Sequence, residues 1–396
     1  MNLRRLCTVL AVTVLATATA TAASAAVHRV SPGESIQAAI DNASPGDTIL
    51  VEPGVYQETG NADYGLRVTT DNLRLIGSVG EAGKVRLVHY GTQRTGVYVA
   101  PEGCGPAVLA GGCPAEIQGF YIRGFSVEDF PRNGIQTRFV NDFEIVRNES
   151  VRNLNNGIYP TISANGVVAA NVSYGSLDTA MWVAAVENVR VIGNELYDSV
   201  IGFEITVSNG VDVRQNDIHD NVVGVGLFHP NATFNTPLPV MTDWVVEHNN
   251  IHDNNLFPNP APEGSFQAGL PSGVGVLLLG VSDHSVSKNN VENNDYVGIG
   301  VLGWCTATAT GDPNRNCVND PPRADPSVNN NLISLNKLKD NGLKPPPGPL
   351  GALAADLTYF NLIESSSGNC FEKNKPKGQV TYVSSEPDGE LPTDGC

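Results

Sequence analysis

The sequence predicts an all-β solenoid in which each coil contributes three short strands, and two periodic series of residues lead to this prediction. The residues Gly134, Gly157, Ala180, Gly202 and Gly224 are separated by 23, 23, 22 and 22 positions. A series of asparagines runs in step with them and comprises Asn148, Asn171, Asn194, Asn216, Asn249, Asn289 and Asn336. Such a period is typical of a unit that stacks on copies of itself. The intervening segments are short and rich in Val and Ile, which excludes a solenoid of helix pairs.

Aligned copies of the repeat place one strand after the glycine position, one before the asparagine and one across it. Because side chains alternate along a strand, every second position is expected to face a shared interior. Three apolar columns fit this expectation: Ile158, Met181, Phe203, Val225, Val274, Ile299; Ile145, Val168, Val191, Val213, Val246, Val286; and Leu196, Ile218, Ile251, Val291, Leu338. The repeated asparagine is expected to hydrogen-bond backbone groups at the bend between two strands.

The two ends of the chain differ from the repeats. Residues 1–25 join a basic start and an apolar stretch to a small-residue cleavage site at Ala23–Ala25, which predicts a secretory signal peptide. The segment Ser35–Ala43 is predicted to be a short amphipathic helix that caps the first coil. The solenoid is expected to extend over residues 26–369, and residues 370–396 are expected to cap or trail its last coil.

Short motifs near the start of the solenoid carry a family resemblance. Ser31–Ile40 (SPGESIQAAI), Pro45–Ile49 (PGDTI) and Glu52–Tyr56 (EPGVY) resemble the entry to right-handed parallel β-helix proteins of the pectin lyase-like superfamily. Asn216–Asn221 (NDIHDN) is similar to the generic repeat of that group. The resemblance implies the fold, but the group includes lyases, hydrolases, epimerases and adhesins. The chain lacks the Asn-Thr-Asp, Gly-His-Gly and Arg-Ile-Lys runs of polygalacturonases and the Asp-Pro-His run of alginate epimerases.

The charge of the chain limits its partners. The formal net charge is −17, and removal of Arg4 and Arg5 with the signal peptide leaves 22 basic against 41 acidic residues. Nucleic acid is therefore excluded as an expected partner, because phosphate binding needs a basic surface. A polysaccharide or cell-surface glycan remains, and an acidic one would need a local basic patch or calcium. Outside the signal peptide no apolar run is long enough to span a membrane, so a secreted, extracellular monomer without membrane insertion is expected.

Six cysteines remain after the signal peptide, and they fall as neighbours in the sequence. Fifteen pairings are formally open. Because each neighbouring pair brackets a loop or the tail and export favours oxidation, three local disulfides are predicted: Cys104 with Cys113, Cys305 with Cys317, and Cys370 with Cys396. A metal site is the rival interpretation, but no Cys-x-x-Cys spacing or histidine cluster favours it.

Insertions interrupt the period in the second half of the chain. Residues 229–242 and 305–328 follow the strand after the glycine position, whereas residues 255–271 and 343–356 follow the asparagine turn before it. The two sets are therefore expected at opposite borders of one face, where they would wall a groove. Alternation places one outward row along this face: Gln136, Tyr159, Trp182, Glu204, Gly226, Gly275 and Gly300.

Candidate functional residues lie in and beside this row. Glu204 is the strongest candidate acid or base, and Asp178, on the turn before Trp182, is its nearest partner. Arg138 could pair with a carboxylate of the substrate, and His229 could carry a second proton. Tyr159 and Trp182 are expected to form a flat platform for sugar rings, with Gln136 and Phe228 as further substrate contacts. The alternative is that the aromatic residues pack beneath the inserted loops and that Glu204 is one solvated charge.

A second outward column combines rings and carboxylates at another turn. Tyr174, Tyr197, His219 and His252 occupy one position, and Asp198, Asp220, Asp253 and Asp340 occupy the next. Such neighbours could bind a metal or transfer protons, and calcium on the aspartate column stays open. The resemblance favours a structural role in solvation and turn bonding. No cofactor is otherwise expected.

Two classes of function fit these residues. The first is a secreted carbohydrate-active protein, of polysaccharide lyase, epimerase or hydrolase type, that uses the groove. The second is a non-catalytic extracellular module that presents its loops to a matrix or surface partner, alone or as an accessory to an exported enzyme. The groove and its aromatic residues favour the first class, and the missing catalytic motifs favour the second, so the sequence leaves open whether the protein is an enzyme.

Overall fold

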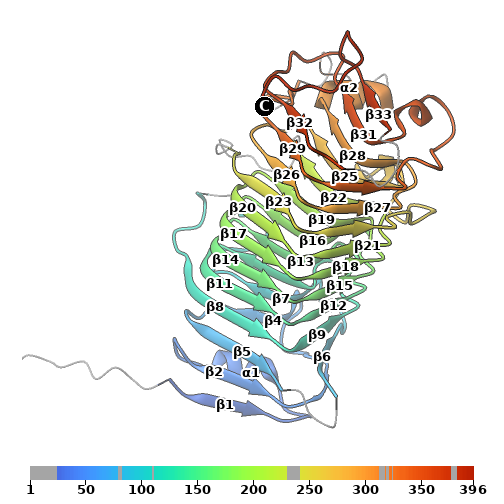
Figure 1. The fold of residues 1–396 in the computed structure, drawn as a ribbon. Helices are drawn as coiled ribbons and strands as arrows, with labels where there is room; N and C mark the ends of the chain where they lie inside the picture. Colours follow the sequence, from blue (N-terminus) through green and yellow to red (C-terminus); the bar gives the residue numbers. More distant parts are fainter. Residues whose placement is uncertain are drawn as a thin grey trace, which may run out of the picture.

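Three parallel sheets wind into a single β-helix (Figure 1). The computed structural model describes residues 25–78, 83–108, 111–229, 241–311, 317, 321–322, 324–375 and 381–396. Sheet A contains β1 (Val27–Val30), β2 (Thr48–Val51), β5 (Leu73–Gly77), β8 (Ile117–Arg123), β11 (Val140–Val146), β14 (Ala164–Ala169), β17 (Glu187–Ile192), β20 (Asn209–Arg214), β23 (Trp244–Glu247), β26 (Ser285–Ser287), β29 (Leu332–Ser334) and β32 (Cys370–Glu372).

The other two sheets complete each coil. Sheet B contains β3 (Gly54–Tyr56), β6 (Val85–Val88), β9 (Phe125–Glu128), β12 (Glu149–Val151), β15 (Val172–Tyr174), β18 (Glu195–Tyr197), β21 (Asp217–His219), β24 (Asn250–His252), β27 (Asn290–Glu292) and β30 (Lys337–Lys339). Sheet C contains β4 (Tyr64–Val68), β7 (Thr95–Val99), β10 (Ile135–Arg138), β13 (Asn156–Thr161), β16 (Thr179–Ala184), β19 (Ile201–Thr206), β22 (Val223–Phe228), β25 (Val274–Leu279), β28 (Val297–Leu302), β31 (Ala355–Phe360) and β33 (Tyr382–Ser384). The predicted all-β solenoid with three strands per coil is confirmed.

The apolar columns predicted from the repeats form the core. In sheet A, Val213 pairs with Val246 and Val246 with Val286, and all three side chains are fully buried. One member of the first predicted column was wrong by two residues, because Val225 pairs with Val276 and not with Val274. Two consecutive Gly-Val pairs follow the insertion, at residues 273–276. The valine of the second pair, Val276, is the one that aligns with Val225 of the preceding coil. Glycine is needed there because a Cβ on Gly275 would lie 2.8 Å from the Asn294 amide nitrogen.

The asparagine ladder holds the bend between sheets A and B. Asn194 Oδ1 accepts from the backbone N–H and the side-chain amide of Asn171, and Asn194 in turn donates to Asn216 Oδ1. The residue before each ladder asparagine has a positive φ, as at Ala170 (54°) and Gln215 (56°). The bend therefore removes backbone groups from the sheets, and the asparagine side chains satisfy them. The predicted structural role of the ladder is confirmed.

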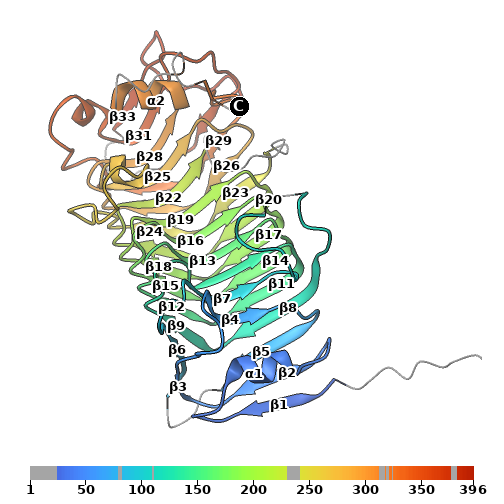
Figure 2. The same cartoon turned by 180° about the vertical axis from the view of Figure 1, so that it is seen from behind.

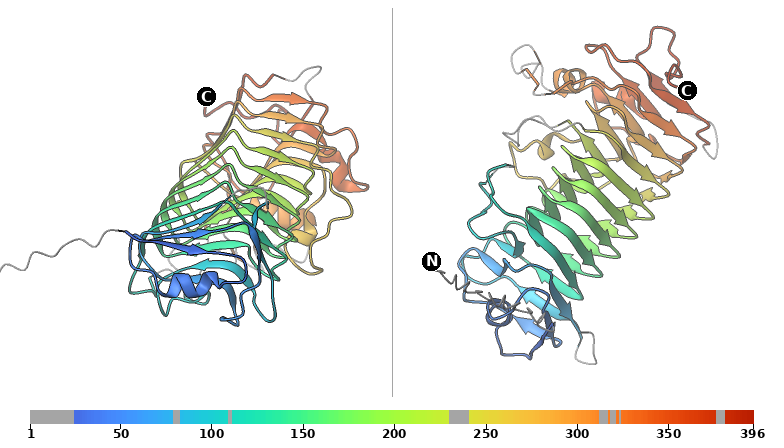
Figure 3. Two further views of the ribbon diagram at one scale, coloured as in Figure 1. Left: turned by 90° about the horizontal axis from the view of Figure 1, so that it is seen from below. Right: turned by 90° about the vertical axis from the view of Figure 1, so that its left-hand side faces the viewer.

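Helix α1 (Ile36–Asp41) lies across the N-terminal end of the coils (Figure 3, left). The Ser35 side chain caps it by accepting from the Ala38 N–H at 3.0 Å, and Ile36 and Ile40 are buried against the first coils. At the other end, β32 and β33 extend sheets A and C. The predicted disulfides Cys104–Cys113, Cys305–Cys317 and Cys370–Cys396 are all present.

The predicted signal peptide lies outside the described residues, apart from Ala25. Within the described part of the chain, no helix has the length and apolar character needed to cross a membrane.

The insertions emerge at the two borders of sheet C, as the sequence predicts. Residues 229–243 and 303–331 connect sheet C to sheet A, and the second connection contains α2 (Trp304–Gly311). Residues 253–273 and 340–354 connect sheet B to sheet C and contain the short 3-10 helices η1 (Gln267–Gly269) and η2 (Pro349–Leu353). Figure 2 shows α2 beside β28 and β31. The C-terminal half of sheet C is therefore flanked by inserted segments on both sides.

Candidate active site

The outer face of sheet C collects most of the residues that the sequence singles out. The row runs from β10 to β28 through Gln136, Tyr159, Trp182, Glu204, Gly226, Leu277 and Gly300. Leu277 occupies the place predicted for Gly275, which follows from the two-residue register error. Of the three glycines expected in this row, Gly226 and Gly300 are therefore separated by a leucine.

Asp178 directly precedes β16, and Glu204 lies in β19. Thr179, the first residue of β16, contacts both carboxyl groups. The Thr179 hydroxyl oxygen lies 2.8 Å from Glu204 Oε2 and 3.2 Å from Asp178 Oδ1. Gln267, in η1, donates to Asp178 Oδ1 at 2.7 Å. This contact ties the insertion at residues 253–273 to the carboxyl pair.

Burial governs the protonation of both carboxyl groups. Glu204 is only 6% exposed, and burial together with the negative charge of Asp178 raises its pKa well above the ordinary range. Burial also raises the pKa of Asp178, to about 6, although hydrogen bonds from Thr179 and Gln267 act in the opposite direction. Both shifts favour the protonated forms, and because the two groups interact, their protons are lost in two steps that belong to the pair as a whole.

The hydrogen-bond geometry agrees with one shared proton. A hydroxyl group has a single proton to donate, so Thr179 cannot donate to both carboxylates at once. Both contacts are hydrogen bonds only when one carboxyl group is protonated and donates to the Thr179 oxygen. A hydrogen-bond chain in which protonated Glu204 donates to Thr179, and Thr179 donates to Asp178, gives all three groups a partner. The arrangement can therefore supply an acid and a base at one place.

Tyr159 and Trp182 do not form the predicted flat platform. Their rings stack face to face, with centroids 4.6 Å apart and planes 8° from parallel, so each ring covers a face of the other. Tyr159 is only 9% exposed, while Trp182 is partly exposed and donates from its indole nitrogen to Thr206 Oγ1 at 3.0 Å. Residues one coil apart stack along the helix axis, which sets this orientation. The pair can offer the partly exposed Trp182 ring to a ligand.

Arg138 is buried away from the carboxyl pair. It lies three strands from Glu204, roughly 14 Å along the stack. One guanidinium nitrogen donates to the Val108 carbonyl, and burial lowers the pKa of Arg138. Its Nε has no hydrogen-bond partner within the described residues. Arg138 and Gln136, which accepts from Asn133, are thus separate from the acid–base pair.

His229 and Phe228 lie beneath the inserted segments at the end of β22. The Phe228 ring contacts Phe266 edge to face at 5.6 Å and is 2% exposed. His229 Nε2 lies 3.1 Å from the Ala324 carbonyl oxygen, and burial lowers the His229 pKa. The predicted roles of these two residues as substrate contact and proton carrier stay predictions, and both side chains are covered.

The second column forms a stacked ladder with a structural explanation. Ring centroids from Tyr174 through Tyr197 and His219 to His252 are 4.8, 5.1 and 5.1 Å apart. Asp198, Asp220, Asp253 and Asp340 all have φ between 51° and 55°, a conformation that aspartate tolerates. Burial opposes protonation of His252, but hydrogen bonds with Asp253 and Asp217 outweigh it and raise its pKa. Within the described residues, the aspartates form no close set of three metal ligands.

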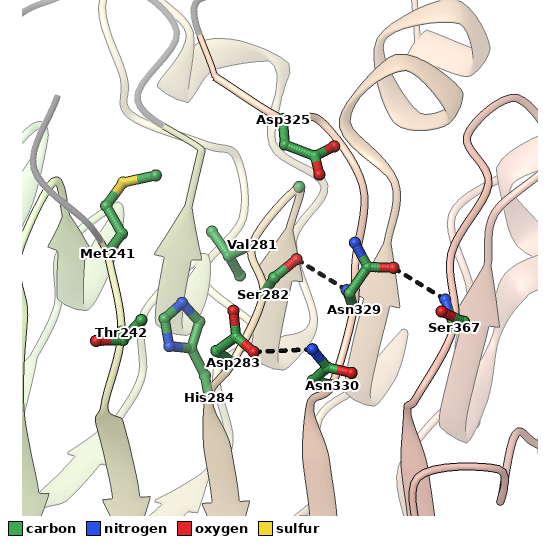
Figure 4. A pocket seen from close by; sticks show the side chains of 11 residues that line it. Met241, Thr242, Val281, Ser282, Asp283, His284, Asp325, Asn329, Asn330 and Ser367 are labelled. Atoms are coloured by element: carbon green, nitrogen blue, oxygen red, sulfur yellow. Dashed lines mark hydrogen bonds between the residues drawn. The ribbon is translucent and has the colours of Figure 1, made fainter. Parts of the chain in front are cut away.

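Two cavities lie near the inserted segments. One, of about 480 Å³, covers the outer face of β25, β28 and β31 and has mostly apolar walls. The other, of about 420 Å³, lies at the border between sheets C and A (Figure 4). It is polar, with Asp283 accepting from Asn330 at 2.9 Å, and it contains His284, whose ring stacks on Trp244 at 4.0 Å. Burial lowers the His284 pKa to about 3.

The sequence alone did not identify Thr179, Gln267 or the apolar cavity. Thr179 directly precedes Ala180, which takes the place of the repeated glycine in its coil, and it belongs to no sequence motif. Gln267 lies 89 residues from Asp178 and reaches it only through the path of an insertion. A Gln in a Pro- and Gly-rich loop gives no signal of such a contact.

Comparisons with known proteins agree with the fold. A family model described as a right-handed β-helix region matches residues 133–313. The DFA-IIIase of Arthrobacter chlorophenolicus A6, solved in complex with GF2, is similar with a TM-score of 0.55 and 14% identity, over 88% of this chain and 84% of that chain. The Dettilon tailspike protein is similar with a TM-score of 0.51 and 12% identity, over 86% of this chain and 60% of that chain. No curated protein matches the sequence. At these identities the likeness establishes the fold alone.

Proposed function

We propose that this right-handed parallel β-helix protein of the pectin lyase-like type is a carbohydrate-active enzyme that cleaves glycosidic bonds. The observation that carries the proposal is that the Asp178 and Glu204 carboxyl groups both contact the Thr179 hydroxyl, in surroundings that raise the pKa of each. Perturbed carboxyl groups in close contact are typical of catalytic acids and bases. The two solved neighbours are carbohydrate-active β-helix proteins, which supports the general kind of function.

The spacing of the pair favours cleavage with retention of configuration. Asp178 Oδ1 and Glu204 Oε2 each lie within 3.2 Å of the Thr179 hydroxyl oxygen, so these two carboxyl oxygens are at most roughly 6 Å apart. An inverting enzyme needs a wider gap that holds a water molecule between carboxylate and sugar. Arg138 is too distant to neutralise a uronate at the same sugar, so elimination is less favoured.

Each carboxyl group then has one role. The Asp178 carboxylate attacks the anomeric carbon, the bond to the leaving oxygen breaks, and that oxygen takes the bonding electrons and the proton of Glu204. Water then attacks the same carbon, gives a proton to Glu204 and releases Asp178 as a carboxylate. Trp182, adjacent to Glu204 in the row, is the proposed contact for the neighbouring sugar, with Tyr159 stacked behind it.

The proposal places the enzyme outside the cytoplasm. Three disulfides favour an oxidising compartment, and the predicted signal peptide agrees with export. Neutral glycans are the favoured substrates, since the net charge of −17 repels acidic polymers.

A polysaccharide panel tests the proposed activity. We expect new reducing ends from at least one neutral glycan, and Glu204→Gln and Asp178→Asn should each lower the rate by about 100-fold or more. Glu195→Gln serves as the control, because Glu195 is a half-exposed carboxylate on sheet B. No cleavage of any polymer, or equal losses in the control, would overturn the proposal. Glycan binding that survives Glu204→Gln without any cleavage would instead indicate a binding module.

A further inference from the structure

The apolar cavity on sheet C is distinct from the carboxyl pair. Leu277, Gly300 and Thr358 of three successive strands form its floor. One side is formed by residues 264–271, and α2 and η2 contribute the remaining walls. Neither Asp178 nor Glu204 lines it. Leu277 is two strands from Glu204, roughly 10 Å along the stack.

The chemistry of the walls excludes a sugar as the occupant. Most lining side chains are apolar, among them Phe266, Leu270, Leu279, Leu302, Leu353 and Phe360. Four of the five hydroxyl groups that line it donate to backbone carbonyls: Thr308 to Trp304 at 2.9 Å, Thr310 to Thr306 at 2.7 Å, Thr358 to Leu353 at 2.8 Å and Tyr296 to Leu350 at 2.8 Å. The fifth, Ser265, accepts from the Ala268 N–H at 3.1 Å. Sugar hydroxyls buried there would find few partners, and unpaired buried polar groups are costly.

The size of the cavity and its apolar walls point to a small apolar group. Its volume of about 480 Å³ falls in the range of small-molecule sites and is too small for a docked helix or strand of another protein. It extends across β25, β28 and β31, which spans roughly 10 Å along the stack. Gly300, in the floor, carries no side chain, and a Cβ there would lie 3.1 Å from the nearest Leu302 carbon. An apolar space that spans three strands can hold an aliphatic chain.

We infer that this cavity binds an acyl chain. The chain can come from a free fatty acid or from a glycan that carries an acyl group. Phe266 lines the cavity, and the next residue, Gln267, bonds to Asp178, so an acylated glycan held here would bring its sugars toward the carboxyl pair. That second source rests on the proposed function, whereas binding of the chain itself does not.

Calorimetry with fatty acids of graded chain length tests the site. Each added methylene should tighten binding about fourfold, because it removes further apolar surface from water, until the chain fills the cavity. Ala307→Phe places a ring in the cavity from α2 and should weaken binding at least tenfold. Ala309→Phe is the matched control, since Ala309 lies on the same helix and does not line the cavity. Leu353→Phe fills the cavity from the opposite wall and gives a second test should Ala307→Phe fail to fold.

The outcomes separate this inference from the proposed function. Glu204→Gln should bind fatty acid as the wild type does, even if no glycan is ever cleaved. Tighter binding of an acylated glycan than of its deacylated form identifies the glycan as a source, and binding of the free acid alone identifies the fatty acid. The absence of binding, a lack of dependence on chain length, or equal weakening by Ala307→Phe and Ala309→Phe would overturn the inference.

Discussion

Glu204 and Asp178 are residues whose burial opposes the stability of the fold. A carboxylate removed from water loses hydration, and a second carboxyl group nearby adds repulsion. Thr179 and Gln267 compensate only in part, since burial still raises the Asp178 pKa to about 6. An arrangement that costs stability and lies among aromatic side chains in an outer row is typical of a functional site.

Asp178→Asn is predicted to stabilise the protein near neutral pH. Because the folded pKa of Asp178 exceeds its ordinary value of 3.8, the folded state retains a proton that the unfolded state has lost. The free energy of unfolding therefore falls as pH rises from about 4 to 6, and the resulting cost persists above pH 6. The variant should be more stable than the wild type at pH 7 by up to about 3 kcal/mol, from about 1.4 kcal/mol for each pH unit.

Denaturant unfolding at pH 4 and pH 7 measures this difference. The advantage of Asp178→Asn should be largely lost at pH 4, since the carboxyl group is then protonated in the folded protein. A variant that is less stable than the wild type at pH 7, or an advantage that is the same at both pH values, would show that Asp178 is not a destabilised group.

The asparagine ladder is the element that fixes the register of the coils. Each member satisfies backbone groups of its neighbours at a bend where the preceding residue has a positive φ. Asn216 accepts from the backbone and side-chain amides of Asn194 at 2.9 Å, and donates to the Val191 carbonyl and to Asn249. The ladder therefore connects coils through side chains as well as through sheet hydrogen bonds.

Asn216→Ala is predicted to destabilise the solenoid by about 3–5 kcal/mol, because it leaves several buried amide and carbonyl groups without partners. Asn250→Ala is the matched control: Asn250 also stacks with an asparagine one coil away, Asn290, but its side chain is exposed. The control should cost less than about 0.5 kcal/mol. Equal unfolding free energies for the two variants would contradict the proposed role of the ladder.

At the scale of the whole molecule, sheet C divides into two halves with different outer surfaces. Strands β10 to β19 present the aromatic pair and the carboxyl groups, and strands β25 to β31 present an apolar floor beneath the inserted segments. The β-helix scaffold sets these positions, because each strand lies one spacing from the next. The insertions add what the repeats lack, namely walls and the Gln267 contact to Asp178.

The repeats made the fold and most of the row predictable from the sequence. Asparagine spacing identified the bends, and alternation placed Glu204 on the outer face. The predicted register was wrong where two Gly-Val pairs follow an insertion. The period alone cannot decide whether Gly273 or Gly275 takes the place of the repeated glycine. The stacked orientation of Tyr159 and Trp182, the Thr179 bridge and the apolar cavity depend on contacts between coils and loops, which no local pattern encodes.

The pH dependence of kcat/KM on a cleaved glycan, compared between wild type and Asp178→Asn, tests the central claim that chemistry resides in the Asp178–Glu204 pair. Asp178 must be ionised and Glu204 protonated, so the wild type should show a bell-shaped profile with its acid limb near pH 6. The residual activity of Asp178→Asn should lack that limb. A wild-type profile that is flat from pH 4 to 7, or an acid limb that persists in Asp178→Asn, would contradict the account.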